Sequence, residues 1–239
     1  MAMQDIRLRY RGSLLGPFWI TLSTAVMVGV MGVIYPHLFH TDVRSYLPFL
    51  AIGIVVWQFI QTVIIDSCQV FLDAQGVILQ APLPFSIHVY RMVARNFIVL
   101  AHNLVIIPAV LVILRVPIGL SALQIVPALT LIAINGVWLG ILFGMISARF
   151  RDIPPIVASV VQVLFFITPI FWSPEVLGKW ERLFELNPIF AAIDVIRAPL
   201  LGKAPVFLSW PVLAATTVIG STLTFAFFAR FRSRIAYWI

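Results

Sequence analysis

The stretch "GILFGMISARFRDIPPIVASVVQVLFF", residues 140–166, decides the fold. Arg149, Arg151 and Asp152 separate two apolar runs, and Pro154 and Pro155 follow at once. Proline is well tolerated in the first turn of a helix, because the N–H groups there have no intrahelical partner. The stretch therefore predicts two long apolar helices joined by a tight, charged turn.

The composition of the whole chain indicates that a bilayer is its solvent. The 239 residues are 62% hydrophobic and 10% charged, whereas a soluble domain has about 25% charged residues. A membrane-spanning helix needs about 20 consecutive apolar residues. We therefore expect an all-α membrane protein with six transmembrane helices. Their predicted bounds are Pro17–Phe39, Leu47–Ile65, Asn96–Leu114, Ala122–Ser147, Pro155–Phe171 and Val206–Ala229.

The distribution of basic residues predicts the orientation of these spans. Of the 16 Arg and Lys residues, ten lie on the side of the N terminus and six on the other side. The positive-inside rule places the richer side, and with it both termini, in the cytoplasm. The ten are Arg7, Arg9, Arg11, Arg91, Arg95, Arg149, Arg151, Arg230, Arg232 and Arg234, and the six are Arg44, Arg115, Lys179, Arg182, Arg197 and Lys203.

Three segments outside the spans have a predicted structure of their own. Residues 1–16 separate apolar and basic side chains, as in an amphipathic helix at the membrane interface. Residues 73–95 are interrupted by prolines and then favour a short helix. Within residues 173–205, the segment "NPIFAAIDVIRAPLLG" is apolar but has only about ten residues between its prolines, too few to cross a hydrocarbon core of about 30 Å. We expect a re-entrant or interfacial helical hairpin there, with Asp194 and Arg197 close enough to pair.

The motif "HLFHTD", residues 37–42, has a spacing that resembles a metal site. Polar residues at a helix end explain His37, His40 and Asp42 equally well, and we assign no metal site. Asp66 is either the intramembrane acid of a proton-coupled carrier or, as its place near the end of a span favours, an interfacial residue.

Two further features concern helix packing within the bilayer. His102 and Asn103 lie inside the third span, where interhelical hydrogen bonding is favoured over lining a pore. Gly136, Gly140 and Gly144 share one face of the fourth span, and glycines at this spacing allow helices to approach closely. Packing within one subunit is favoured, and the seam of a dimer or channel is the alternative.

Six aromatic residues are candidates for lining a channel, although an aromatic belt at the membrane interface uses the same residues. These six are Trp19, Trp57, Phe165, Phe166, Phe171 and Trp172.

Missing motifs limit the possible functions. The sequence lacks G-x-x-x-x-G-K-[ST] and any evident nucleophile–base arrangement. We therefore expect no enzyme and no ATP site on this chain, so that a pump would take its energy from an ion gradient or a partner. The net charge of +7 does not indicate nucleic-acid binding, because the basic residues form no patch interleaved with aromatic residues.

Five stretches together resemble the ABC-2 type permeases of polysaccharide exporters. They are "DIRLRYRGSLLGPFW", "ILQAPLPFSIHVYRMVARNFIVLAHN", "ARFRDI", "ITPIFWSPE" and "LNPIFAAIDVIRAPLLG", in family order over nearly the whole chain. The similarity is greatest to the permeases that export lipid-linked O-antigen.

This resemblance implies one ABC-2 transmembrane domain over residues 1–239 of a bacterial inner-membrane exporter. Two copies of the chain would form the channel, and two copies of a separate ATPase subunit would bind ATP and Mg and drive it. The cargo would be a polyprenyl-pyrophosphate-linked polysaccharide. Residues 4–13 would form a gate helix whose Arg7, Arg9 and Arg11 attract the anionic head group.

The resemblance also implies which residues contact the ATPase. The loop 73–95 would supply a coupling helix, and the "ARFRD" turn would be a second contact region. The expected residues are Leu83, Pro84, Phe85, His88, Arg91, Arg149, Arg151 and Asp152. One departure is Gln80, which stands where relatives often have a basic residue.

Three other functions remain open at this point. An ABC-2 exporter of a small hydrophobic compound would share the fold. An ion-coupled secondary transporter would need a titrating acid in the bilayer, for which only Asp66 comes close. A membrane enzyme acting on polyprenyl phosphate would need converging His, Asp or Arg side chains.

Overall fold

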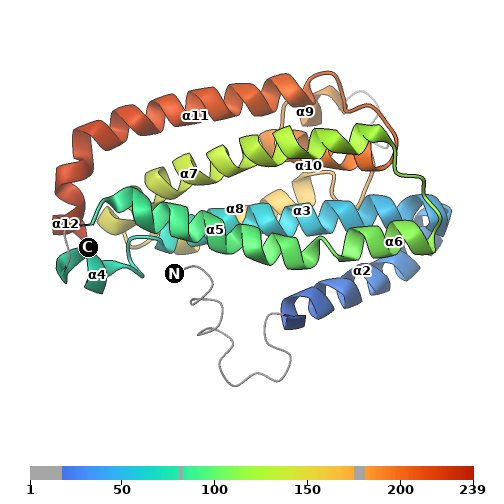
Figure 1. Ribbon diagram of the computed structural model, residues 1–239, viewed down its shortest axis with the longest axis horizontal. Helices are drawn as coiled ribbons and strands as arrows, with labels where there is room; N and C mark the ends of the chain where they lie inside the picture. The colour runs from blue at the N-terminus through green and yellow to red at the C-terminus, as the bar shows by residue number, and fades with distance from the viewer. Residues whose placement is uncertain (1–17, 81–82, 175–180) are drawn as a thin grey trace.

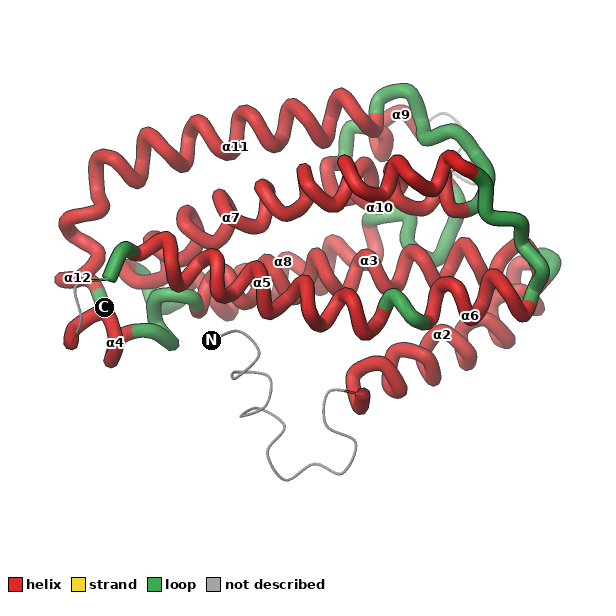
Figure 2. The backbone as a smooth tube through the Cα atoms, viewed as in Figure 1, coloured by secondary structure: helices red, strands yellow, loops and turns green. Residues whose placement is uncertain are grey.

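The computed structural model describes residues 18–80, 83–174 and 181–239, and every regular element within these ranges is a helix. The expected all-α class is therefore confirmed (Figures 1 and 2). The helices are α2 (Phe18–Phe39), α3 (Val43–Gln69), α4 (Gln75–Gln80), α5 (Phe85–Asn103), α6 (Ile106–Ile113), η1 (Leu120–Gln124), α7 (Ile125–Arg149), α8 (Ile153–Ile167), α9 (Glu181–Glu185), α10 (Pro188–Leu200), α11 (Ser209–Phe231), η3 (Arg232–Arg234) and α12 (Ile235–Trp238).

Five helical segments among the described residues are long and apolar enough to cross a membrane. They correspond to the first four predicted spans and the sixth. Their bounds are Phe18–Leu38, Val43–Gln69, Phe85–Ile113, Leu120–Arg149 and Ser209–Trp238. The predicted fifth span coincides with α8, which has 15 residues. At about 1.5 Å per residue, α8 is about 22 Å long and falls short of a hydrocarbon core of about 30 Å.

The charged turn between α7 and α8 is as tight as the sequence predicts. α7 ends at Arg149 and α8 begins at Ile153, so three residues connect them. Both prolines lie in the first turn of α8, where they remove no intrahelical hydrogen bond.

The third span begins earlier than predicted. A separate short helix was expected after Pro84, but Phe85–Asn103 is one continuous helix, α5. This segment contains no proline, so its backbone hydrogen bonds continue unbroken. The interruption comes between α5 and α6. Pro108 explains it, because the proline ring would clash with the carbonyl group of Leu104 in a continuous helix.

The long helices lie side by side along the long axis of the molecule (Figure 1). α3 packs against α2, α5, α7, α8 and α10, and it is the most buried of the five candidate spans. α2 packs mainly against α3 and α5, and most of its surface is exposed. One end of the bundle carries α4, α12 and the C terminus, and the other carries the end of α6 and α9 (Figure 2).

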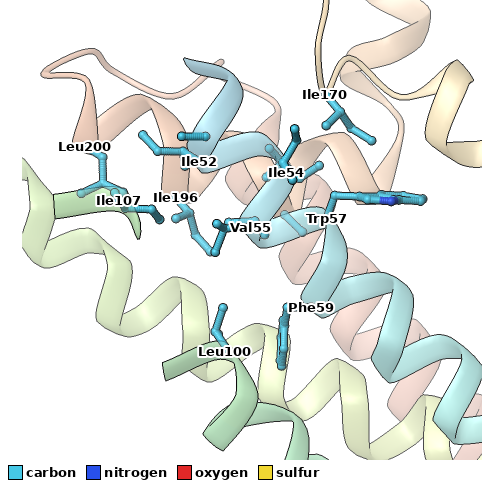
Figure 3. Packing of buried hydrophobic residues seen from close by; sticks show 14 of the residues in the cluster. Ile52, Ile54, Val55, Trp57, Phe59, Leu100, Ile107, Ile170, Ile196 and Leu200 are labelled. Carbon is cyan, nitrogen blue, oxygen red and sulfur yellow. The ribbon is translucent and has the colours of Figure 1, made fainter. Parts of the chain in front are cut away.

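The main core lies where α3 meets α5, α6 and α10 (Figure 3). Ile52 and Val55 of α3 pack there with Leu100, Ile107 and Ile196. α10 is enclosed by protein, because every residue from Phe190 to Leu200 is buried. Asn187 caps α10 by accepting a 2.9 Å hydrogen bond from the N–H of Ile189. The second half of the predicted outer segment is therefore a helix packed inside the bundle.

Asp194 and Arg197 lie close enough on α10 for their charges to interact, but they do not form a direct ion pair. Oδ2 of Asp194 accepts hydrogen bonds from the N–H of Val206 at 2.8 Å and Oγ of Ser209 at 2.7 Å. Nη1 of Arg197 donates to the carbonyl of Pro169 at 3.0 Å. Both charged groups instead hold neighbouring segments against α10, since a buried charge needs strong hydrogen-bond partners.

The glycine stripe of α7 packs inside the subunit. A Cβ atom on Gly140 would lie 2.7 Å from Cγ1 of Val89, and one on Gly144 would lie 2.6 Å from Cγ1 of Val70. A Cβ atom on Gly136 would be 3.3 Å from Val63 and Val93. The favoured interpretation is therefore confirmed, because the stripe brings α7 against α3 and α5.

Candidate functional site

A polar cavity of about 290 Å³ lies between α2, α3 and α5. Ser23 and Thr24 line it from the first turns of α2, and Gln58 and Gln61 line it from α3. Polar side chains within membrane-spanning helices are costly unless they pair with one another or face water. They often mark a transport path. The cavity is therefore one candidate functional site.

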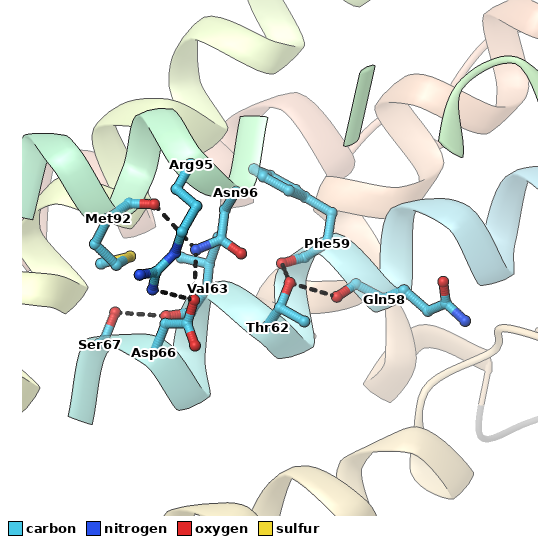
Figure 4. Close-up of polar contacts among 9 residues, drawn as sticks. All are labelled: Gln58, Phe59, Thr62, Val63, Asp66, Ser67, Met92, Arg95 and Asn96. Carbon is cyan, nitrogen blue, oxygen red and sulfur yellow. Dashed lines mark hydrogen bonds and ion pairs between the residues drawn. The ribbon is translucent and has the colours of Figure 1, made fainter. Parts of the chain in front are cut away.

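An ion pair stands at one end of this cavity (Figure 4). Nη2 of Arg95 lies 2.8 Å from Oδ2 of Asp66, and the two side chains are 17% and 21% exposed. Nδ2 of Asn96 donates to the same carboxylate oxygen at 2.9 Å and to the carbonyl of Met92 at 3.1 Å. Asp66 is thus neutralised by a partner on the next span, which gives little support to a proton-coupled carrier.

Two hydrogen bonds tie α2 to the walls of the cavity. Oγ1 of Thr24 donates to Oε1 of Gln58 at 2.7 Å, and Oγ1 of Thr21 donates to Oδ1 of Asn103 at 3.0 Å. The predicted interhelical role of Asn103 is therefore confirmed. His102 instead places Nδ1 2.7 Å from the carbonyl oxygen of Ile98 in its own helix, and its ring contacts Phe18 edge-on.

A second candidate site is an aromatic cluster where α3 meets α8 and the segment after it. The ring centroids of Trp57 and Phe165 are 5.6 Å apart, and those of Phe165 and Phe171 are 5.5 Å apart. Phe166 contacts both phenylalanines, and Tyr35 of α2 contacts Phe171 at 5.7 Å. Four of the six channel candidates thus lie together.

The remaining two aromatic candidates differ in position. Trp172 lies beside the cluster, where its Nε1 donates to the carbonyl of Phe166 at 3.3 Å and its ring contacts Phe184. Trp19 lies at the start of α2, outside the aromatic cluster, and is exposed. Whether any of the six lines a channel remains a prediction.

The residues expected to contact an ATPase fall at the end of the bundle that carries α12. Leu83 is exposed, Pro84 is the N-cap of α5, and the ring of Phe85 lies 5.7 Å from that of Phe71. His88 is buried, and its Nε2 atom has no hydrogen-bond partner among the described residues. Arg91 is half-buried one turn further along α5.

The second expected contact region lies at the same end. Arg149, Arg151 and Asp152 are exposed in and beside the α7–α8 turn. The guanidinium carbon of Arg149 lies 5.2 Å from the ring centroid of Phe150 and 5.3 Å from that of Trp238. Their role in coupling remains a prediction.

Several residues of these sites were not expected from the sequence. Arg95 and Asn96 were counted only as loop or span-boundary residues, and Gln58 and Trp238 were not considered. The sequence did contain a signal for them, because charged and amide side chains within or beside an apolar run need hydrogen-bond partners in a bilayer. Sequence alone does not show which partner each one has.

The expected gate helix, residues 4–13, lies outside the described residues, as do Arg7, Arg9 and Arg11. His37, which belongs to the metal-like motif, places Nδ1 2.7 Å from the carbonyl oxygen of Val33 in its own helix.

The several long apolar helices are those of a multi-pass membrane protein. A model of the ABC-2 type transporter family matches residues 1–201. The chain therefore belongs to the ABC-2 type transporter family, whose members are membrane subunits of transporters, and the resemblance seen in the sequence is confirmed.

Three relatives carry the same printed name, "O-antigen export system permease protein RfbA". Two come from Klebsiella pneumoniae and are 25% and 23% identical to this chain over 195 residues, covering 80% of it and 74% of each relative. The third comes from Myxococcus xanthus and is 20% identical over 209 residues, covering 83% of this chain and 77% of the relative.

Proposed function

We propose that this chain is the membrane-spanning permease of an ATP-driven exporter. Its cargo is a polyprenyl-pyrophosphate-linked polysaccharide, moved from the cytoplasm to the outer side of a bacterial inner membrane. The observation that carries the proposal is the family match over residues 1–201, together with relatives named as O-antigen export permeases.

The proposed assembly has two copies of this chain and two copies of an ATPase subunit. ATP and Mg bind the ATPase, and this chain has no catalytic residue. The two permease copies form the channel between them, with both termini of each copy in the cytoplasm. α8 and the segment after it supply the fifth of six crossings, and α9 with α10 forms the outer re-entrant hairpin.

The proposed ATPase contact is the end of the bundle near α12. Its support is that the first turns of α5 and the last turns of α7 share a second hydrophobic cluster, in which Ile235 of α12 packs with Val89 and Met145. We expect this packing to couple movements of the two helix ends. Such rigid-body shifts are an established way of switching a membrane protein between states.

The proposed substrate path has two parts, of which the gate helix lies outside the described residues. The aromatic cluster around Phe165 offers flat apolar faces on which sugar rings can stack. Three arginines of the gate helix, Arg7, Arg9 and Arg11, provide charge for the pyrophosphate, because Arg binds phosphate by paired hydrogen bonds.

The proposal is tested by export from proteoliposomes. The permease is reconstituted with and without its co-purifying ATPase, and a polyprenyl-pyrophosphate-linked glycan is supplied on the ATPase side. We expect export only when the ATPase and ATP are both present. Export driven by a proton gradient through this chain alone would overturn the proposal in favour of an ion-coupled carrier. ATP-dependent export of small hydrophobic compounds but not of the glycan would show that the proposed cargo is wrong, although the chain is still an ATP-driven permease.

A further inference from the structure

The cavity between α2, α3 and α5 is equipped with hydroxyl and amide groups and has no excess charge. Arg95 and Asp66 are the two charged residues that line it, and they neutralise each other. The other polar lining residues include Gln58, Gln61 and Asn103, whose side chains are neutral donors and acceptors. This lining favours a neutral ligand with several hydroxyl groups over an ion.

Hydrogen-bonding capacity remains unused in this cavity. Gln58 uses Oε1 to accept from Thr24, and Asn103 uses Oδ1 to accept from Thr21. Within the described part of the chain, neither amide nitrogen donates a hydrogen bond, and Gln61 makes no side-chain hydrogen bond at all. These amide groups line the cavity, where a ligand with hydroxyl groups can form hydrogen bonds with them.

The cavity lies at one edge of the membrane-crossing part of the bundle. Its α2 wall is made by Ile20, Ser23 and Thr24, which belong to the first two turns of that span. α3 runs antiparallel to α2, so Asp66 lies level with the start of α2, near the membrane surface. In the orientation proposed above this is the cytoplasmic surface, where the head of a lipid-linked molecule resides.

We propose that this cavity binds the sugar attached directly to the lipid pyrophosphate of the cargo. The inference rests on the proposed function and adds a recognition site to it. The volume of about 290 Å³ lies at the lower end of the range for ligand sites, about 300–1,000 Å³, and suits one sugar better than a chain. The pyrophosphate, being anionic, stays outside this neutral cavity.

Binding to two matched lipids tests this inference. The full-length permease in lipid nanodiscs is titrated with polyprenyl pyrophosphate carrying one N-acetylhexosamine and with the same lipid carrying no sugar. The wild-type chain is expected to prefer the sugar-bearing lipid. Gln61→Leu removes a lining amide that supports no other contact, so folding is preserved, and the preference should fall about fivefold for each hydrogen bond lost. Binding of the bare lipid should stay unchanged.

Gln124→Leu is the matched control, because Gln124 lies in η1 outside the cavity. It should retain the full preference. The free N-acetylhexosamine, added as a competitor, shows whether the sugar alone is recognised or only the sugar next to its lipid. Equal binding of the two lipids by the wild type, or an unchanged preference in Gln61→Leu, would overturn the inference. The proposed function would survive that result if the wild type still exports glycan with ATP, and it would fail separately if it does not.

Discussion

The guanidinium group of Arg149 lies over the ring of Trp238, 5.3 Å from its centroid, so the last turn of α7 contacts the last helix of the chain. One turn before Trp238, Ile235 is completely buried and packs in the cluster that contains Val89 and Met145. α12 therefore joins the beginning of α5 to the end of α7. Positively charged groups over aromatic faces add about 0.5–1 kcal/mol at exposed sites.

Replacing Ile235 should destabilise the chain. Ile235→Ala leaves a cavity in this cluster, and such a change costs about 2–5 kcal/mol. The measurement is thermal unfolding of the purified chain in detergent. Tyr237→Ala is the control, because Tyr237 is 89% exposed and should shift the midpoint little. Equal shifts for both variants would show that α12 is not held as described.

Replacing Arg151 should weaken binding of the ATPase without unfolding the permease. Arg151 is exposed in the α7–α8 turn, and an exposed ion pair contributes about 0.2–1 kcal/mol, so Arg151→Gln should weaken binding by up to about fivefold. Binding is measured by titrating the ATPase onto immobilised permease. Lys203→Gln, in the exposed segment between α10 and α11, should leave it unchanged. A larger effect at Lys203 would mean that the proposed contact is at the wrong end.

Breaking the ion pair between Asp66 and Arg95 should destabilise the chain more than removing both charges. Asp66→Asn leaves the guanidinium group without its carboxylate, which costs about 1–3 kcal/mol. The double variant Asp66→Asn/Arg95→Gln should recover part of the loss in thermal unfolding.

The same variants separate two modes of energy supply. An ATP-driven exporter needs no titrating acid, so any export by the double variant should still require ATP and should not respond to a proton gradient. Export by the wild type that requires a proton gradient and is lost in the double variant would contradict the proposed energy supply.

An added methyl group on Gly140 should disturb the packing of α7. Its Cβ would lie 2.7 Å from Val89 and 2.9 Å from Met92, and overpacking of this kind costs about 1–3 kcal/mol. Gly29→Ala on α2 is the control, since nothing lies within 4 Å and alanine favours the helix by up to about 1 kcal/mol. The midpoint of thermal unfolding should therefore fall for Gly140→Ala and rise for Gly29→Ala. A higher midpoint for Gly140→Ala would contradict the described contact.

Truncating the aromatic cluster should reduce glycan export. Phe165 contacts Trp57, Phe166 and Phe171. Phe165→Leu removes an aromatic ring whose stacking is worth about 1 kcal/mol. If sugars stack on this ring, the rate of export should fall roughly fivefold. Export is measured in proteoliposomes at constant ATPase activity. Phe207→Leu, at an 88% exposed position, should export as the wild type does. Unchanged export by Phe165→Leu would remove the cluster from the path.

The sequence was informative where the signal is local. Long apolar runs predicted the helical class, and the proline pair at Pro154 and Pro155 predicted where α8 begins. The continuity of α5 was missed, because Arg91 and Arg95 made its first turns resemble a separate short helix outside the span. Those turns pack against protein at one end of the bundle, and this tertiary contact overrides the local charge.

The candidate sites depend more on distant contacts. Asp66 was recognised as unusual, but its partner Arg95 is 29 residues away, and no periodicity predicts such a pair. The charges of Asp194 and Arg197 interact as expected, but the two side chains do not form a direct pair. Adjacent positions on a helix allowed that contact, whereas Ser209 and Pro169 from other segments offered better partners.

The unbroken course of α5 also connects one end of the bundle with the polar cavity. Nineteen residues at about 1.5 Å each make a rod about 28 Å long, with Phe85 at one tip and Asn103 at the other. Between α5 and α6 the N–H groups of Val105 and Ile107 bond to carbonyl groups three residues earlier instead of four, so the regular helix is interrupted there. We expect a push at Phe85 to move Asn96 and Asn103 together, and with them this wall of the polar cavity.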